Sequence, residues 1–410
     1  MNYLKKMNIN FLIALIIPFL IWGPFFPDLV ISLSSLLFLI YLFKKKKFNY
    51  FNNKPIIIFF VFCSYCILIS LFSAKNILFS LQSSLFYFRI GIFACLIWFL
   101  IERDKKILKY FYYALIISFS ALIVDGYIQF FFGTNIIGLS KSNSRISSFF
   151  GDELIIGSYL ARLSPLLFAL FLVKKKKKLE FYFALIFFMF LTGLIFLSGE
   201  RASFFLYSLS LIFIIIFTDM LPKLKITILV CYFILSAVIT LNFDKVRNRM
   251  ILEPVDSISK SIFTPSHESL IKTAYNMFLD KPIFGHGPKM FRVLCKEEKY
   301  KSEIYDCENH PHNFYVQLLA ETGIIGFSFL FSAFAYVLYC TYRQFKSMVL
   351  RQKRYLTNYQ VCLLAGILIT IWPLTTNGNF FNNWLMIVYS LPVGFYLHSI
   401  YSKNRKNIFF

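Results

Sequence analysis

The sequence is short of charged residues, and of acidic residues above all. Asp and Glu contribute 20 of its 410 residues, and all charged residues together make up 15%, against about 25% in soluble domains. Hydrophobic residues, by contrast, make up 58%, and Phe alone occurs 53 times. A soluble domain has too little interior to bury so much apolar surface. The composition therefore excludes a soluble enzyme, a disordered chain and a disulfide-dense secreted module.

Motifs for several common chemistries are also missing. The chain has no G-x-x-x-x-G-K-[ST] loop for nucleotide phosphates and no G-x-S-x-G nucleophile elbow. The two-residue spacing of His310 and His312 matches none of the common zinc patterns. Polar and apolar residues do not alternate as they do in the strands of an outer-membrane barrel. We therefore expect neither ATP hydrolysis nor a bound metal or cofactor.

Apolar runs of about 17–25 residues, long enough for a transmembrane helix, recur along the chain. We count about twelve, and expect a bend at Gly323 or Gly326 in the tenth. They lie near residues 9–25, 28–43, 55–73, 85–101, 110–130, 154–173, 181–198, 203–221, 226–242, 313–342, 359–375 and 382–401. The sequence thus predicts an all-α polytopic membrane protein.

Basic residues are distributed unevenly between the segments that connect these runs. Every second connection is basic, and these connections together with the termini hold 26 Lys and Arg residues. The short connections on the other side hold four, namely Lys75, Lys141, Arg145 and Arg201. Because basic loops stay in the cytoplasm, we expect both termini there, in a bacterial inner membrane. The net charge of +23 then reflects topology and not nucleic-acid binding. The first run lacks a small-residue cleavage site, so no cleavable signal peptide is expected.

One connection is far longer than the others. Residues 243–312 form a polar loop on the outer, periplasmic side, between nine predicted spans in 1–242 and three in 313–410. The loop holds 10 of the 20 acidic residues and four of the five histidines. Connections of this length are uncommon unless they are functional. We therefore expect the chemistry of the protein at this loop.

The loop carries signs of local structure. Apolar residues spaced three or four apart between Leu270 and Phe278 predict an amphipathic helix, with Ser266 as its N-cap. The glycines of 285–288 predict a tight turn. Cys295 and Cys307 lie outside the predicted spans, and on an oxidising face we expect them to form a disulfide. Two free thiols are the alternative.

The segment that begins at His312 is the most informative. His312 lies at the outer end of the tenth predicted span, and Gln317 and Glu321 follow on one helical stripe. A carboxylate inside a span is costly and by default functional. The alternative is structural, with His312 capping the span at the interface and Glu321 paired to a neighbour.

This segment also resembles a known signature. His312–Asn313, followed after nine intervening residues by Gly323 and after two more intervening residues by Gly326, resembles the signature of the O-antigen ligase family, which shares a domain with many O-antigen polymerases. The turn at 282–288 resembles the P-x-x-G-x-G turn of that family. Residues 198–201 resemble its S-x-S-R segment.

The resemblance implies a GT-C-type membrane fold and an inverting, metal-independent glycan transfer. Ligases of the family move a glycan from undecaprenyl diphosphate to a sugar hydroxyl of lipid A-core. Polymerases of the same superfamily extend a glycan that stays on the carrier lipid. The diphosphate is already a good leaving group, so the reaction needs no nucleotide. Its charges suit the guanidinium fork of Arg, and the acceptor hydroxyl suits a His base.

The same resemblance assigns roles to residues of this sequence. His312 is expected to act as the base or to orient the acceptor, and Arg201 to bind the diphosphate. The family usually has a second Arg before the P-x-x-G-x-G turn, where this sequence has His267. Candidates for the missing ligand are His267 as an imidazolium, Arg145, Arg247 and Arg249. Contact with lipid headgroups is the alternative for these arginines.

A second group of polar residues lies within or next to the predicted spans. We expect Asn313 and Glu321 to take part in substrate binding, with a helix contact as the alternative for Glu321. Arg89, Arg162 and Asp125 are rare charges in the membrane. They either form structural pairs or line a lipid groove.

A transporter or flippase for lipid-linked oligosaccharide is the alternative from another class. Such a protein would have two repeated halves, and we find no such symmetry in the sequence. The predicted partners are therefore an undecaprenyl-diphosphate-linked glycan, a lipid A-core acceptor and membrane lipids. The sequence leaves open whether a flippase, a polymerase or a chain-length regulator acts beside it. It also does not separate ligase from polymerase.

Overall fold

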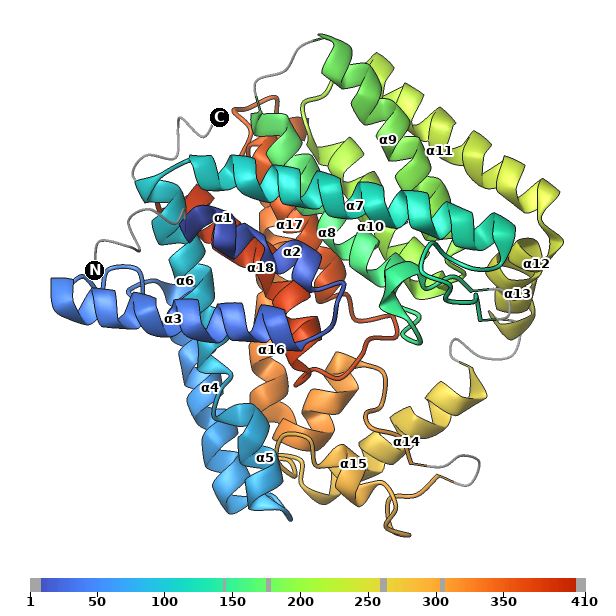
Figure 1. Cartoon of the computed structure of the whole chain (residues 1–410). Coiled ribbons are helices and arrows are strands. Elements are labelled where there is room, and N and C mark those ends of the chain that lie inside the picture. The colour runs from blue at the N-terminus through green and yellow to red at the C-terminus, as the bar shows by residue number, and fades with distance from the viewer. Residues whose placement is uncertain (1–8, 143–144, 175–177, 259–263, 303–306, 403–410) are drawn as a thin grey trace.

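The computed structural model describes residues 9–142, 145–174, 178–258, 264–302 and 307–402. Every regular element in these ranges is helical, apart from two isolated β-bridges (Figure 1). The elements are α1 (Ile9–Ala14), α2 (Ile16–Phe19), α3 (Phe25–Lys45), α4 (Lys54–Phe72), α5 (Ile77–Ser84), α6 (Phe88–Arg103), α7 (Lys106–Phe132), η1 (Ser148–Phe150), α8 (Ile156–Val173), α9 (Lys178–Leu197), α10 (Arg201–Phe217), α11 (Pro222–Asn242), α12 (Asp244–Arg247), η2 (Asn248–Leu252), α13 (Glu253–Ile258), α14 (Pro265–Asp280), α15 (Phe291–Leu294), α16 (Phe314–Val349), α17 (Asn358–Thr370) and α18 (Asn383–Tyr401). The predicted all-α fold is confirmed.

The predicted spans correspond to these helices. Within the described ranges, nine helices are long and apolar enough to cross a membrane, and three apolar helices are shorter. The first predicted span is broken into α1 and α2, and the fourth extends back through α5, which the sequence did not predict. The chain is thus a multi-pass membrane protein. The basic residues of 1–8, 175–177 and 403–410, which contribute to the charge bias, lie outside the described residues.

Helices α17 and α18 lie at the centre of the bundle (Figure 1). Helix α17 packs on α8 and α10, and α18 packs on α6 and α17. Outer helices present apolar side chains away from this core, as a lipid environment requires. On α11 only Ile239 is buried, while Phe233 and Leu241 are exposed.

Asparagine begins several of the helices. The side chains of Asn53, Asn76, Asn313 and Asn382 accept hydrogen bonds from the first free N–H groups of α4, α5, α16 and α18. An N-cap of this kind satisfies donors that have no partner within the helix. The boundaries of these helices are therefore encoded locally, at one residue each.

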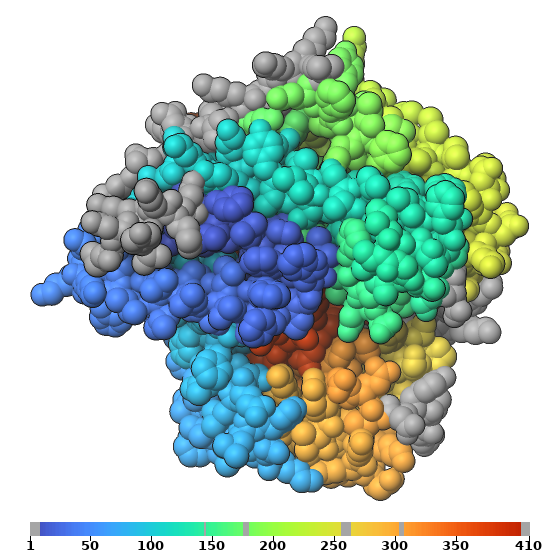
Figure 2. Space-filling model, in the orientation of Figure 1, coloured from blue at the N-terminus to red at the C-terminus, as the bar shows by residue number. Residues whose placement is uncertain are grey.

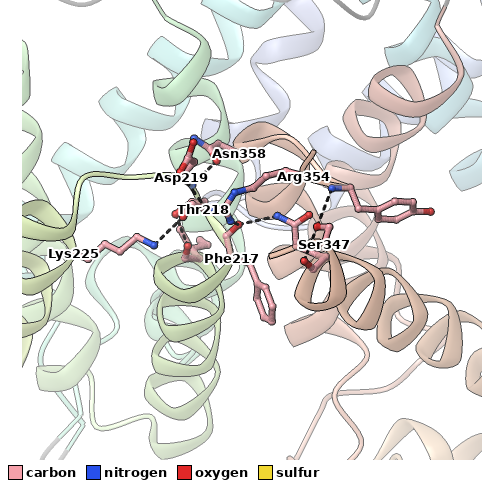
Figure 3. Close-up of polar contacts among 10 residues, drawn as sticks. Phe217, Thr218, Asp219, Lys225, Ser347, Arg354 and Asn358 are labelled. Carbon is pink, nitrogen blue, oxygen red and sulfur yellow. Dashed lines mark hydrogen bonds and ion pairs between the residues drawn. The ribbon is translucent and has the colours of Figure 1, made fainter. Parts of the chain in front are cut away.

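The C-terminal end of α10 is held by three side chains from other segments (Figure 3). Arg354 Nη1 and Gln344 Nε2 both donate to the carbonyl of Phe217, at 3.2 and 3.0 Å, and Lys225 Nζ donates to the carbonyl of Thr218 at 2.8 Å. Cations at a helix C-terminus offset its partial negative charge. A mainly apolar cavity of about 630 Å³ lies between α7, α8, α9, α10 and α11 near this end.

The P-x-x-G-x-G turn packs into a kink of α16. Gly323 has a left-handed backbone (φ 62°), which interrupts the helix. The turn satisfies the backbone groups that the kink frees: Ile324 N donates to Pro282 O at 2.9 Å, and Gly287 N donates to Glu321 O at 2.7 Å. A Cβ atom at Gly323 would overlap the backbone of Ile283. The bend expected at one of two glycines therefore falls at Gly323.

We expect Gly323→Ala to destabilise the protein strongly. A left-handed backbone costs a non-glycine residue about 1–3 kcal/mol, and the overlap with Ile283 adds to that. Thermal unfolding of the purified protein measures the effect. Gly366→Ala is the matched control, because its Cβ atom would lie 3.4 Å from Pro165, an ordinary contact. Equal melting temperatures for the two variants would contradict this account.

Candidate active site

A cavity of about 1050 Å³ opens at the N-terminal ends of α8 and α10. Figure 2 shows it as a hollow between the dark blue N-terminal helices, the green loop and the orange loop, with atoms of the red C-terminal part at its floor. Among the described residues, the ionisable side chains that line it are Arg145, Arg162, Arg201, Arg249, Arg292, Glu153, Glu200, His267, His310 and His312. Arginine outnumbers glutamate, so the cavity is suited to an anion.

Glu200 fixes the two helices that meet at the cavity. Its carboxylate accepts hydrogen bonds from the N–H groups of Gly157 and Ser158, at 2.6 and 3.0 Å, and so caps α8. It also accepts from Ser203 Oγ at 2.8 Å, in the first turn of α10. A carboxylate at two helix N-termini is favourable electrostatically. Arg201, the next residue, is thereby placed at the cavity.

Polar side chains at the end of α7 hold the loop that carries Arg145. Asp125 accepts from Ser148 Oγ at 2.5 Å and from Ile136 N at 2.9 Å, and Gln129 accepts from the N–H of Ser148 at 2.7 Å. Asp125 and Gln129 are completely buried. Asp125 therefore forms structural contacts, one of the two roles open from the sequence.

Arg145 and Arg249 both approach Gly199, and Arg201 lies within electrostatic range of both. Gly199 has φ 70°, and a Cβ atom there would lie 3.0 Å from Arg249 Nε and 3.2 Å from Arg145 Cγ. Burial lowers the pKa of Arg145 and Arg249, and the charge of Arg201 lowers both further. Among the described residues, Arg201 forms a long ion pair, 3.7 Å from Glu253. Crowded cations of this kind gain stability when an anion binds between them.

His312 lies at the cavity beside two other histidines. Its ring centroid is 4.1 Å from that of His310 and 4.9 Å from that of His267. Its Nε2 atom lies 2.7 Å from a carboxylate oxygen of Glu308. The backbone of His312 is left-handed (φ 54°), and its carbonyl accepts a hydrogen bond from Asn377 N at 2.8 Å.

The other two histidines are held neutral by their surroundings. Burial, and then the neighbouring His312, lowers the pKa of His310 to about 3. The same two causes lower the pKa of His267 below its usual value. The imidazolium form expected for His267 is therefore disfavoured, although a neutral ring can still donate one N–H to an anion.

The shift at His310 predicts a loss of stability in acid. The unfolded chain, with a His pKa of about 6.5, binds more protons than the folded chain below that pH, so stability falls as the pH drops from about 6.5 toward 3. We expect the melting temperature of the wild type to fall more steeply between about pH 7.5 and 5 than that of His310→Gln. The melting temperature of His310→Gln should still fall with pH, but less steeply, because burial also lowers the pKa of His267 and His286. Parallel pH profiles would contradict the assignment.

Several residues predicted for the site lie elsewhere. Arg247 pairs with Asp244 at 2.8 Å and does not line the cavity. Asn313 uses its side chain to cap α16 and to donate to Pro373 O at 2.7 Å. Glu321 is completely buried and accepts a hydrogen bond from Phe291 N at 3.0 Å, at the start of α15. In the structure, Asn313 and Glu321 therefore form contacts that stabilise the ends of helices α16 and α15.

The two loop cysteines lie outside the cavity as well. The structure joins Cys295 and Cys307 in a disulfide, with their Cα atoms 5.3 Å apart. Cys295 is buried in a small apolar core that includes Leu270 of α14 and Phe291 of α15. The disulfide therefore ties the segment before His312 to this core.

The structure also brings in residues that the sequence had not assigned to the site. Arg292, Glu200 and His310 line the cavity, as does Arg162, whose role had been open. Arg162 donates to Asn377 Oδ1 at 2.9 Å and lies over the ring of Tyr389. The sequence indicated a role for Glu200 only through its position within the S-x-S-R-like segment. In the part of the chain that the structure describes, no three or more His, Cys, Asp or Glu side chains gather in a group that could hold a metal ion.

Comparison with known proteins agrees with this architecture. A family model described as O-antigen ligase matches residues 185–331, a segment that includes Arg201, the loop and His312. The chain is also similar to the teichuronic acid biosynthesis protein TuaE of Bacillus subtilis (strain 168), with 25% identity over 121 residues. That match covers 29% of this chain and 24% of TuaE, so it spans about a quarter of the relative's length.

The fold and the cavity define a multi-pass membrane protein with an arginine-lined cavity at one end of its helix bundle. The match of residues 185–331 to the family model confirms the resemblance to the O-antigen ligase family found in the sequence. This family suggests a membrane glycosyltransferase-like enzyme.

Proposed function

We propose that the protein transfers a glycan from undecaprenyl diphosphate to an acceptor hydroxyl in the cavity. The observation that carries this proposal is the meeting of Arg145, Arg201, Arg249 and Arg292 with His312 in one cavity. The arginines come from four different segments, so the arrangement is a product of the fold. An anionic ligand and a base are what such a transfer requires of the protein.

In this proposal the arginines bind the diphosphate of the donor. Guanidinium groups bind phosphate oxygens through paired, charge-assisted hydrogen bonds. Arg201 and Arg249 are the principal ligands, and Arg145 and Arg292 line the same cavity. As the bond between the anomeric carbon and the diphosphate breaks, negative charge grows on the leaving oxygen. Fixed cations stabilise that charge in the transition state.

His312 acts on the acceptor in the same step. The hydroxyl oxygen of the acceptor bonds to the anomeric carbon, its proton goes to His312, and the diphosphate leaves with the electron pair of the broken bond. Attack from the face opposite the diphosphate inverts the anomeric centre. The imidazolium then returns its proton to solvent. No nucleotide, metal or cofactor enters this scheme.

We place the cavity on the periplasmic side of a bacterial inner membrane, with both termini in the cytoplasm. This orientation rests on the bias of Lys and Arg toward the connections at the opposite end of the bundle. Lys225 and Arg354, which hold the end of α10, belong to those connections. Lipid-linked glycan would enter the cavity from the outer leaflet.

A sugar hydroxyl of lipid A-core is the acceptor we favour, as in the O-antigen ligases whose family model the chain matches. The second candidate is the end of another lipid-linked glycan, which would make the protein an O-antigen polymerase. The similarity to a teichuronic acid biosynthesis protein favours this second candidate, because its name assigns that relative to a different glycan.

Reconstitution tests the proposal and separates the two acceptors. Purified protein is mixed with undecaprenyl-diphosphate glycan and rough lipopolysaccharide, with EDTA and without nucleotide. We expect glycosylated lipopolysaccharide. Longer glycans that remain on the carrier lipid would identify a polymerase instead. Movement of the donor across the membrane of intact vesicles, without formation of any product, would mean that the protein is a transporter and not a transferase.

A further inference from the structure

The carboxylate of Glu308 lies 2.7 Å from Nε2 of His312, and no role has so far been given to it. We propose that Glu308 is the positioning residue of His312, holding its ring in the orientation and tautomer that leave Nδ1 free to take the acceptor proton. This inference rests on the proposed function, because it assigns a partner to the base of that reaction.

The chemistry of the contact determines which ring nitrogen carries the proton. An ionised carboxylate only accepts hydrogen bonds, so Nε2 must be the protonated nitrogen of a neutral His312. Nδ1 then keeps its lone pair, and no described residue forms a hydrogen bond with it. A base oriented by a third group is the arrangement that recurs in activated nucleophile systems.

The charges around His312 make this carboxylate useful during the reaction. His267 from α14 and His310 from the same loop contact the ring, and Arg201 and Arg292 line the same cavity. All four are neutral or positive, and the described residues supply no second carboxylate bonded to His312. When His312 takes the proton, Glu308 therefore offsets the positive charge that forms on the ring.

The fold holds Glu308 in place from one side. Cys307, its neighbour, is joined to Cys295, which is 2% exposed in the small apolar core with Leu270 and Phe291. Helix α14 of that core also carries His267. The disulfide and α14 therefore connect Glu308 and His267, which both contact His312, to the same small core.

Chemical rescue distinguishes a positioning carboxylate from a structural one. In Glu308→Ala we expect kcat for glycan transfer to fall by about 10-fold or more, but by less than the 10²–10⁴-fold that the general base itself contributes, while KM for the donor stays unchanged. Added formate should restore part of kcat, and Glu308→Asp should keep part of it. Glu298→Ala is the matched control, because Glu298 is exposed, pairs only with Lys301 at 3.6 Å and lies outside the cavity. It should retain full activity with no response to formate.

A second readout needs no substrate. Diethyl pyrocarbonate modifies free imidazole nitrogens, and mass spectrometry reports its rate at His312. Because Glu308 keeps Nδ1 unprotonated and makes it more nucleophilic, we expect slower modification of His312 in Glu308→Ala than in the wild type, and partial recovery of the rate with formate. Two results would overturn the positioning role, each combined with an unchanged rate of His312 modification in Glu308→Ala. One is an unchanged kcat, and the other is a loss of kcat that neither formate nor Glu308→Asp recovers. Absence of transfer by the wild type would overturn the proposed function alone, since the modification rate still reports the contact.

Discussion

His312→Ala is expected to reduce glycan transfer by about 10²–10⁴-fold, the contribution of a general base. The loss should fall on kcat, because the arginines that bind the donor remain in place. It should persist in His312→Gln, which retains hydrogen-bonding capacity but cannot take a proton at neutral pH. Rates of product formation at saturating donor, compared with the wild type, measure the effect.

A histidine of the same loop provides the control. His286 is buried away from the cavity, where its ring lies 3.0 Å from Met277 O. In the folded fraction of His286→Gln, checked by thermal unfolding, transfer should continue. If His312→Ala kept wild-type activity, His312 would be an interfacial cap of α16 and the base would lie elsewhere.

Arg201→Ala is expected to lower kcat/KM by about 100-fold, near the 2.7–4 kcal/mol lost with one fixed donor to a developing charge. Arg201 stands at the first turn of α10, where it lines the cavity with Glu253 at 3.7 Å. Its guanidinium is therefore placed where a ligand in the cavity would contact it. Arg201→Lys should recover part of the loss, because it restores the charge without the paired donors.

Arg247→Ala is the matched control for this charge deletion. Arg247 lies in α12, two positions before the cavity residue Arg249, but pairs with Asp244 outside the cavity. We expect it to change kcat/KM by less than about threefold, as for an exposed ion pair. Equal losses in the Arg201 and Arg247 variants would mean that net positive charge, and not the cavity, attracts the donor.

The helical part of the fold was accessible from sequence because span length and hydropathy are set by the membrane itself. The sequence-based prediction of the spans was wrong at two boundaries. The first span breaks between α1 and α2, and α5 continues the fourth span backward to Ile77. Neither the break nor the extension changes the average hydropathy of the surrounding residues. Composition alone therefore does not indicate either feature.

The site was predicted less completely, for a reason visible in its motifs. Within the His-Asn signature only His312 reaches the cavity, while Asn313 caps α16 and Gly323 accommodates the turn at 282–288. A motif of this kind contains both residues proposed to act in the reaction and residues that stabilise the fold. Sequence spacing does not separate the two, because both need a fixed residue at a fixed place.

Long-range packing explains the residues that were missed. Glu200 acts through the N-terminus of α8, more than 40 positions away in the chain. Arg292 reaches the cavity only because the apolar core around Cys295 carries α15 toward it. Contacts of this kind follow from the tertiary fold, and no local pattern in the sequence encodes them.

Photo-cross-linking with undecaprenyl diphosphate tests most directly whether the arginine-lined cavity binds the donor. A photoreactive analogue is bound to the purified protein, and the labelled peptides are identified by mass spectrometry, with unlabelled lipid as competitor. We expect competed labelling of peptides that contain Arg145, Arg201 or Asn377, which line the cavity. Labelling confined to the apolar cavity between α8, α9 and α11, or unaffected by the competitor, would contradict the account.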